Sequence, residues 1–221
     1  VAGVFAVLTK IGVYALLRFD TLLDAGGGPA PFGDHWLFYL GMATVATGTL
    51  GVLASQQLER LAGFLVIVSS GTLLAAIGFD GTTLTGPALY YLFSSVLGSG
   101  AFFMVIEMAQ RNRSAAADLL AVSFEAFGLQ DASDSEHPDE MVGVAIPAAM
   151  AFLGLTFVSC ALLLTGLPPL SGFVAKVSLL SAAITAATDG ETLRTWLFVA
   201  ALLLSGLAGV MALSRLGSRV F

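Results

Sequence analysis

Two lysines are the residues of this sequence whose type and setting most clearly predict chemistry. Lys10 and Lys176 are the only lysines of the chain, and each lies within a run of apolar residues. A charged side chain deep in a membrane helix costs roughly 2.5–3.5 kcal/mol on insertion scales, and such residues usually have a function. Burial disfavours the charged form of a lysine, whereas a nearby carboxylate favours it. Neighbouring groups can therefore switch such a lysine between charged and neutral, as a proton relay requires, and we predict this role for both residues.

The sequence before Lys176 predicts a break in a membrane helix. Pro168 and Pro169 follow an apolar run, and Gly172 stands four residues before the lysine. Proline lacks a backbone N–H and its ring clashes with the preceding turn, so a helix does not run straight through this pair. In lipid, a broken backbone survives only where protein or a water-filled cavity satisfies the freed polar groups. A structural alternative stays open for each lysine: helix carbonyls and a buried water hold Lys10, and Lys176 reaches back toward the break.

Glu107 is the only carboxylate inside a predicted membrane span, and two interpretations of it are equally compatible with the sequence. It either takes part in the relay or pairs at the membrane edge with Arg111, four residues further along the helix. For Glu59 and Arg60, the polar sequence 56–60 favours an interfacial turn pair over a relay role.

Hydroxyl-bearing side chains gather in the first half of the span that contains Glu107. Such groups hydrogen-bond across helices, and the sequence favours a packing role over a water path for them. The four residues are Tyr90, Tyr91, Ser94 and Ser95.

The composition predicts a polytopic membrane protein that lies in the lipid bilayer of the cell membrane. Of the 221 residues, 57% are hydrophobic and 11% are charged, and the mean hydropathy is +0.92. A soluble domain has roughly 25% charged residues. Because the chain begins with Val1 inside an apolar run, we expect it to be an internal piece of a longer protein.

Several kinds of site are not expected from the composition. The single cysteine, Cys160, excludes an intrachain disulfide. His35 and His137 lie in different polar connections without a second ligand at metal spacing, so we expect no metal site. No basic patch suggests nucleic acid. No nucleotide, flavin or iron–sulfur motif is present, so we expect no cofactor, and any redox chemistry would lie on partner subunits.

About 20 apolar residues cross a bilayer, and this length divides the chain into about seven helical spans in one membrane domain, 1–221. The expected bounds are 1–17, 36–55, 61–79, 87–110, 142–165, 172–187 and 195–213. Turn-forming and charged residues predict a loop at 19–35. The polar connection 111–143 is compatible with a short interfacial helix near 115–129, followed by an acidic, solvated part at 131–140.

Five stretches of the sequence are together specific to one family. Residues 8–18, which contain Lys10, and residues 166–176, which contain both prolines and Lys176, resemble two hallmark stretches of the multisubunit cation/proton antiporters of the Mrp/Pha type. Residues 89–95, 120–128 and 142–147 fit the same family. The resemblance covers essentially the whole chain and is greatest to the D-type subunits of the Pha branch. These antiporters are homologous to the antiporter-like membrane subunits of respiratory NADH:quinone oxidoreductase.

The resemblance implies an all-α fold of about fourteen transmembrane helices, with two inverted repeats that each contain a discontinuous helix. This chain then supplies roughly the seventh to the thirteenth of these helices. Lys10 and Lys176 become related lysines on the two broken helices. The implied partners are the other subunits of an antiporter complex, H+, and Na+ or K+.

The sequence departs from the family pattern in ways that limit what the resemblance carries over. Relatives often have a lysine where this chain has Glu59, and some have a histidine where it has Ser94. The family's glutamate that pairs with the lysine equivalent to Lys10 is expected to precede Val1. We therefore expect that this piece does not transport ions by itself.

Two functions are compatible with these residues. The first is a membrane subunit of a monovalent cation/proton antiporter, in which protonation of one lysine repels a proton from the next. The alternative is a proton-pumping, antiporter-like membrane subunit of NADH:quinone oxidoreductase, with all redox chemistry on partner subunits. The two lysines argue against a purely structural scaffold.

Overall fold

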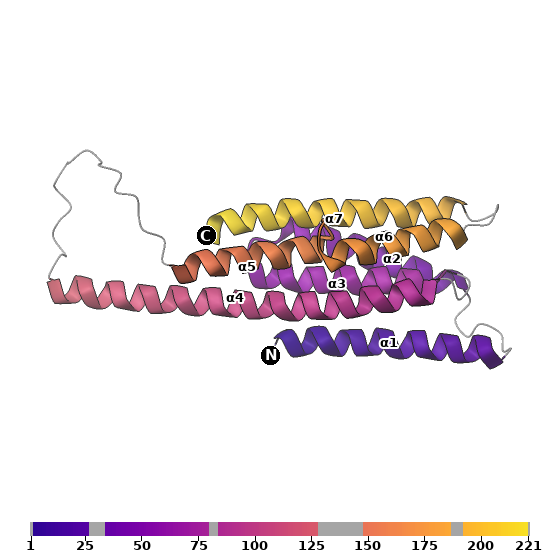
Figure 1. Ribbon diagram of the computed structural model, residues 1–221, viewed down its shortest axis with the longest axis horizontal. Helices are drawn as coiled ribbons and strands as arrows, with labels where there is room; N and C mark the ends of the chain where they lie inside the picture. Colours follow the sequence, from indigo (N-terminus) through magenta and orange to yellow (C-terminus); the bar gives the residue numbers. More distant parts are fainter. Residues whose placement is uncertain (1, 27–33, 80–83, 128–147, 187–191, 221) are drawn as a thin grey trace.

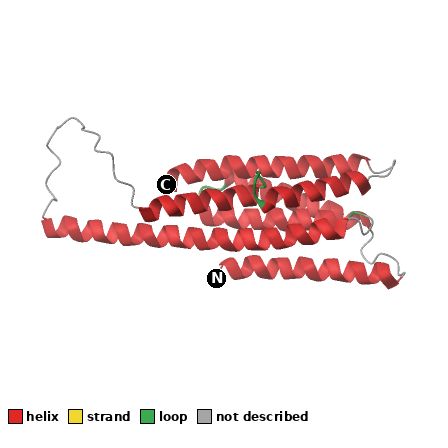
Figure 2. Ribbon diagram, in the orientation of Figure 1, coloured by secondary structure: helices red, strands yellow, loops and turns green. Residues whose placement is uncertain are grey.

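The computed structural model describes residues 2–26, 34–79, 84–127, 148–186 and 192–220. These residues form seven α-helices and no strand, which confirms the all-α prediction (Figures 1 and 2). The helices are α1 (Ala2–Gly26), α2 (Asp34–Ala54), α3 (Leu58–Ile77), α4 (Thr85–Phe127), α5 (Ala148–Thr165), α6 (Ser171–Ala186) and α7 (Thr192–Val220). They lie roughly parallel to one long axis, as spans of a membrane bundle do (Figure 1).

Among the residues that the structure describes, four segments are long and apolar enough to cross a membrane. They are Trp36–Ala54, Leu58–Ile77, Thr85–Arg111 and Thr192–Ser218. The apolar helices Ala151–Thr165 and Ser171–Ala186 are shorter, and 16 residues of α6 extend over only about 24 Å. Figure 1 shows α5 and α6 following one another along nearly one line beside α7. The described parts of the spans expected at 142–165 and 172–187, namely α5 and α6, are therefore two halves of one interrupted crossing.

Two polar segments that we expected to be loops are helical. α1 continues to Gly26 through the first part of the predicted loop at 19–35, and α2 already begins at Asp34. α4 continues without interruption to Phe127, so a separate interfacial helix near 115–129 is wrong (Figure 1). Residues 19–25 and 111–127 contain no proline or glycine. Polar residues alone cost a helix only up to about 0.7 kcal/mol each, which is too little to end it.

Of the other segments expected to be polar connections, one is a helix start and one lies outside the described residues. α3 begins at Leu58, so Glu59 and Arg60 lie in its first turn rather than in the predicted turn at 56–60. The acidic part at 131–140, including His137, lies outside the described residues, as does the stretch 142–147.

Close contact between α2 and α3 fixes the position of the helix that carries several buried hydroxyls. A Cβ atom on Gly41 of α2 would lie 2.2 Å from the backbone nitrogen of Ala75 of α3. A Cβ atom on Gly71 of α3 would lie 2.8 Å from the nitrogen of Val45. Small residues let membrane helices approach in this way. Ser69, Ser70 and Thr72 of α3 are buried beside this contact.

Candidate functional site

Lys10 lies on the one face of α1 that turns toward the other helices. Lys10, Val13 and Leu17 are spaced three and four residues apart and are all buried, Lys10 with only 1% of its surface exposed. Leu8 and Ile11, on the opposite face, are each 59% exposed. The ammonium nitrogen Nζ of Lys10 donates a hydrogen bond to Ser69 Oγ of α3. Lys10 therefore points into the bundle, while apolar side chains of α1 face outward.

The interruption between α5 and α6 occurs at the predicted prolines. Gly166 has a φ of +76°, the left-handed conformation that commonly ends a helix at glycine. The backbone amides of Gly166 and Leu167 both donate to the carbonyl of Leu162, each at 3.0 Å. Pro168 and Pro169, which are joined by a cis peptide bond, are exposed at the turn.

Gly172 lets the first turn of α6 lie directly against the last turn of α5. A Cβ atom at this position would stand 1.9 Å from the carbonyl oxygen of Leu163. No larger residue fits there without moving one of the two half-helices. Gly172 therefore belongs to the break as a packing residue.

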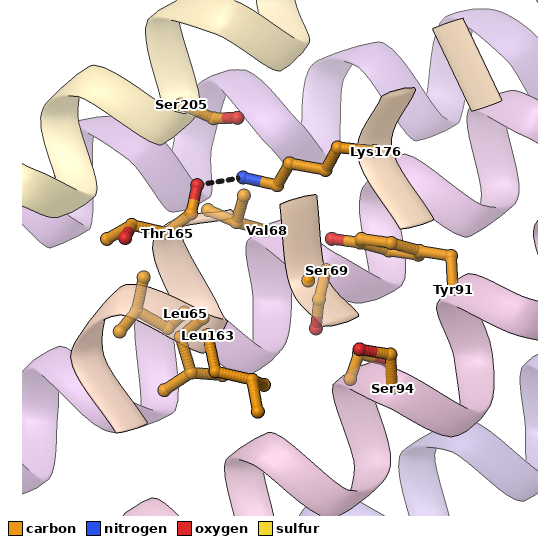
Figure 3. Close-up of a pocket in the computed structure, with 12 residues that line it drawn as sticks. Leu65, Val68, Ser69, Tyr91, Ser94, Leu163, Thr165, Lys176 and Ser205 are labelled. Atoms are coloured by element: carbon orange, nitrogen blue, oxygen red, sulfur yellow. Dashed lines mark hydrogen bonds between the residues drawn. The ribbon is translucent and has the colours of Figure 1, made fainter. Parts of the chain in front are cut away.

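Lys176 binds the end of α5 through a backbone carbonyl. Its Nζ donates to the carbonyl oxygen of Thr165 at 2.7 Å. In a continuous helix this oxygen would accept from the amide four residues later, but that residue is Pro169, which has no N–H. The proline therefore frees the acceptor that the lysine uses. The lysine reaches back toward the break, as one alternative from the sequence expected, and its Nζ lies among α5, α6 and α7 (Figure 3).

A small cavity lined by polar and apolar residues lies between the partners of the two lysines (Figure 3). Its volume is about 20 Å³, which is enough for about one water molecule. Five helices, α3 to α7, contribute to its wall. The polar residues that line it are Ser69, Tyr91, Ser94, Ser95, Thr165, Lys176 and Ser205. Since Ser69 also accepts the hydrogen bond from Lys10, one hydroxyl separates Lys10 from the cavity that Lys176 faces.

Two further contacts bind α4 to this site. Ser94 Oγ lies 3.2 Å from Ser171 Oγ at the start of α6, within hydrogen-bond distance. The Tyr91 hydroxyl is hydrogen-bonded to the side chain of Thr72 on α3. Ser94 thus contacts the second half of the broken helix.

The other residues singled out in the sequence lie away from this cavity. Tyr90 is 44% exposed, and Glu107 is exposed on the outer face of α4. Arg60 is exposed, and Glu59 accepts a hydrogen bond at 2.7 Å from Gln110 of α4. These residues do not join the two lysines. The side chain of His35 lies outside the part of the structure that is described.

Three residues of the site were not identified from the sequence. Ser69 has the sequence signature of a small packing residue, and nothing nearby distinguishes Ser205 from other serines of apolar helices. Thr165 did carry a signal, because a proline four residues after a helical residue frees that residue's carbonyl. That rule would also have identified Leu164, which stands four residues before Pro168.

Comparison with known proteins gives consistent results. The family model described as "NADH:quinone oxidoreductase/Mrp antiporter, TM" matches residues 1–207. A Rhizobium meliloti protein, named as the probable D subunit of a K(+)/H(+) antiporter, is 51% identical over 100% of this chain and 42% of its own length. The D subunit of a Na(+)/H(+) antiporter from Bacillus subtilis is 30% identical over 77% of this chain and 30% of its own length. The chain thus spans less than half the length of these relatives.

A solved structure shares the fold. It is described as the structure of the Mrp complex from Dietzia sp. DQ12-45-1b, and one of its chains superposes with a TM-score of 0.65 at 20% identity. The match covers 96% of this chain and 34% of that chain. The arrangement of helices found here therefore matches about a third of that longer chain.

Proposed function

Since this chain belongs to the NADH:quinone oxidoreductase/Mrp antiporter family of membrane proteins, we propose that it is part of a subunit of a multisubunit monovalent cation/proton antiporter. The subunit passes H+ through the membrane in exchange for Na+ or K+, together with other subunits of the complex. The names of the relatives from Rhizobium meliloti and Bacillus subtilis favour this function over a subunit of a redox enzyme. On this proposal the chain is a transporter component and not an enzyme.

The observation that carries the proposal is that two lysines, Lys10 fully buried and Lys176 partly buried, reach the same small cavity. Lys10 reaches it through Ser69, and Lys176 lines it directly. Charged Lys10 gives a proton to Ser69 Oγ as the hydroxyl turns and releases its own proton to a water in the cavity. The water passes a proton to neutral Lys176, and the freed carbonyl of Thr165 then holds the new ammonium.

Electrostatic interactions determine which of the two lysines holds the proton. The last carbonyls of α5 carry the partial negative charge of a helix C-terminus, which favours the charged form of Lys176. Charges on Lys10 and Lys176 repel each other across a poorly polarisable interior. Protonation of one lysine therefore promotes release from the other, and a change in either lysine's surroundings can move the proton in one direction.

The test is cation/proton exchange by the complete antiporter complex in sealed vesicles. Lys10→Ala and Lys176→Ala should each lower the exchange rate by about a hundredfold or more, as loss of a proton-transfer group usually does. Lys10→Arg and Lys176→Arg should be similarly inactive, because arginine keeps the charge but does not release its proton in proteins. Normal exchange by the assembled arginine variants would show that these positions need only a positive charge, and the relay would be wrong.

A further inference from the structure

Three serines that line the cavity give their hydroxyl protons to carbonyls of their own helices, which leaves their oxygen lone pairs as acceptors. A serine hydroxyl has one proton and two acceptor lone pairs. Ser95 Oγ gives its proton to the carbonyl of Leu92 at 2.9 Å, and Ser205 Oγ gives its proton to the carbonyl of Leu202 at 3.0 Å. Ser69 Oγ likewise donates to the carbonyl of its own helix, three residues earlier, at 2.9 Å. Helices α3, α4 and α7 each present an acceptor to the same small space.

The end of α5 adds backbone acceptors to these hydroxyls. Pro168 and Pro169 remove the amides that would bind the carbonyls of Leu164 and Thr165 in a continuous helix. Both residues line the cavity, and Lys176 binds the second carbonyl. In membrane transporters, unwound carbonyls and the C-terminal ends of half-helices are typical ligands of Na+.

The size of the cavity sets what these acceptors can hold. About 20 Å³ admits one water-sized particle and not an ion with its hydration shell. Oxygen atoms of the protein would have to replace that shell, as hard cations require. The residues that line the cavity in the described part of the chain include no carboxylate, so the wall compensates a single positive charge with dipoles alone.

We propose that this cavity binds one dehydrated monovalent cation, Na+ or K+, in alternation with the proton on Lys176. The proposal rests on the proposed function, because it assigns the cation step of the exchange to the same site. When Lys176 is charged, its ammonium holds the Thr165 carbonyl and repels the ion. When Lys176 releases its proton, the carbonyl and the serine oxygens are free to bind the cation. Each step therefore exchanges one positive charge for another, either the proton on Lys176 for the cation or the cation for the proton.

Few other titratable groups face this ammonium. Tyr91 of α4 lines the cavity, and Lys10 of α1 lies behind Ser69. The residues that α3, α5 and α7 present to the cavity carry hydroxyl groups or are apolar. Gly206 of α7 allows the close approach, since a Cβ atom there would lie 3.5 Å from Lys176 Nζ and 3.2 Å from the Thr165 oxygen. Competition between H+ and the cation therefore centres on Lys176.

The first measurement is equilibrium binding of ²²Na+ and of ⁸⁶Rb+, which substitutes for K+, to the purified complete complex. Ser205→Ala removes one oxygen ligand and should weaken cation binding about tenfold, the range of one lost polar contact. Ser214→Ala is the matched control. Its hydroxyl lies on the same helix and makes the same kind of bond, to the carbonyl of Met211 at 3.1 Å, but it does not line the cavity. Equal binding by the two variants would overturn the proposal.

The second measurement separates this proposal from the relay itself. In the unmodified complex, cation binding should weaken as the pH falls, because protonated Lys176 excludes the ion. Lys176→Met should abolish exchange but retain this cation binding, now without its pH dependence. If Lys176→Met abolishes exchange while the pH dependence of binding stays unchanged, the relay stands and the shared site is wrong. If Lys176→Met exchanges normally, the proposed function itself fails.

Discussion

At the scale of single residues, the hydroxyl of Ser69 has a different role from that of its neighbour. Ser69 and Ser70 are both buried, and both donate to the carbonyl of Val66 at 2.9 Å. Only Ser69 accepts a bond from Lys10 and lines the cavity. The two serines therefore make the same contribution to α3 but differ in their contact with the lysines.

This difference makes a controlled substitution possible. Ser69→Ala should lower cation/proton exchange in vesicles at least about tenfold, because the hydroxyl between Lys10 and the cavity is lost. Ser70→Ala should leave exchange within about twofold, although it too loses the hydrogen bond to the carbonyl of Val66, worth about 1 kcal/mol. Thermal stability of the assembled complex should fall in both variants, and further in Ser69→Ala, because the buried ammonium of Lys10 loses its acceptor. Equal exchange rates in the two variants would exclude Ser69 from the relay.

At the scale of helices, the break between α5 and α6 depends on one backbone conformation. Gly166 adopts a φ of +76°, which costs other L-residues roughly 1–2 kcal/mol. A Cβ atom there would also lie 2.6 Å from Lys176 Cδ. The glycine thus ends α5 and leaves room for the lysine in the same place.

Gly166→Ala should therefore affect both stability and transport. We expect the complex to lose roughly 1–2 kcal/mol of stability, and exchange to fall because the lysine stem is displaced from the Thr165 carbonyl. Gly100→Ala on α4 is the control, since a Cβ atom there meets nothing within 4 Å and alanine favours the helix by roughly 0.5–1 kcal/mol. The readouts are the thermal midpoint of the complex and its exchange rate. A Gly166→Ala complex as active as Gly100→Ala would show that the lysine position tolerates displacement.

The same scale shows what the sequence could and could not predict. The buried setting of Lys10 and the break at Pro168 follow from local chemistry, because apolar runs and missing amide donors need no knowledge of other helices. The approach of Ser69 and Ser205 to the break depends on how α3 and α7 pack. No local pattern separates the serines and glycines at these helix contacts from the others of the chain. In the polar segments, by contrast, the local sequence was misleading. They were expected to be loops, but local polarity alone does not end a helix.

At the scale of the whole molecule, an arginine outside the site links α7, which carries Ser205, to the end of α2. Arg215 of α7 donates from Nη2 to the carbonyl of Leu53 at 2.9 Å and to that of Ser55 at 2.8 Å. These carbonyls end α2, where a helix has unpaired acceptors and partial negative charge. Because α2 packs closely against α3, Arg215 connects the helix that carries Ser205 to the pair that positions Ser69.

Arg215→Gln should consequently weaken the bundle without touching the cavity. The side chain is exposed, so we expect a loss of only about 1 kcal/mol, seen as a lower thermal midpoint of the complete complex. Arg215→Lys should lose less, because an ammonium keeps the charge but not the planar fork that reaches two carbonyls.

Arg60→Gln is the control, because it removes an equal charge from an exposed arginine in the first turn of α3. If it lowers the midpoint as much as Arg215→Gln does, net charge and not the bond to α2 accounts for the effect. With both substitutions exchange should persist below the midpoint, because neither changes a group that faces the two lysines.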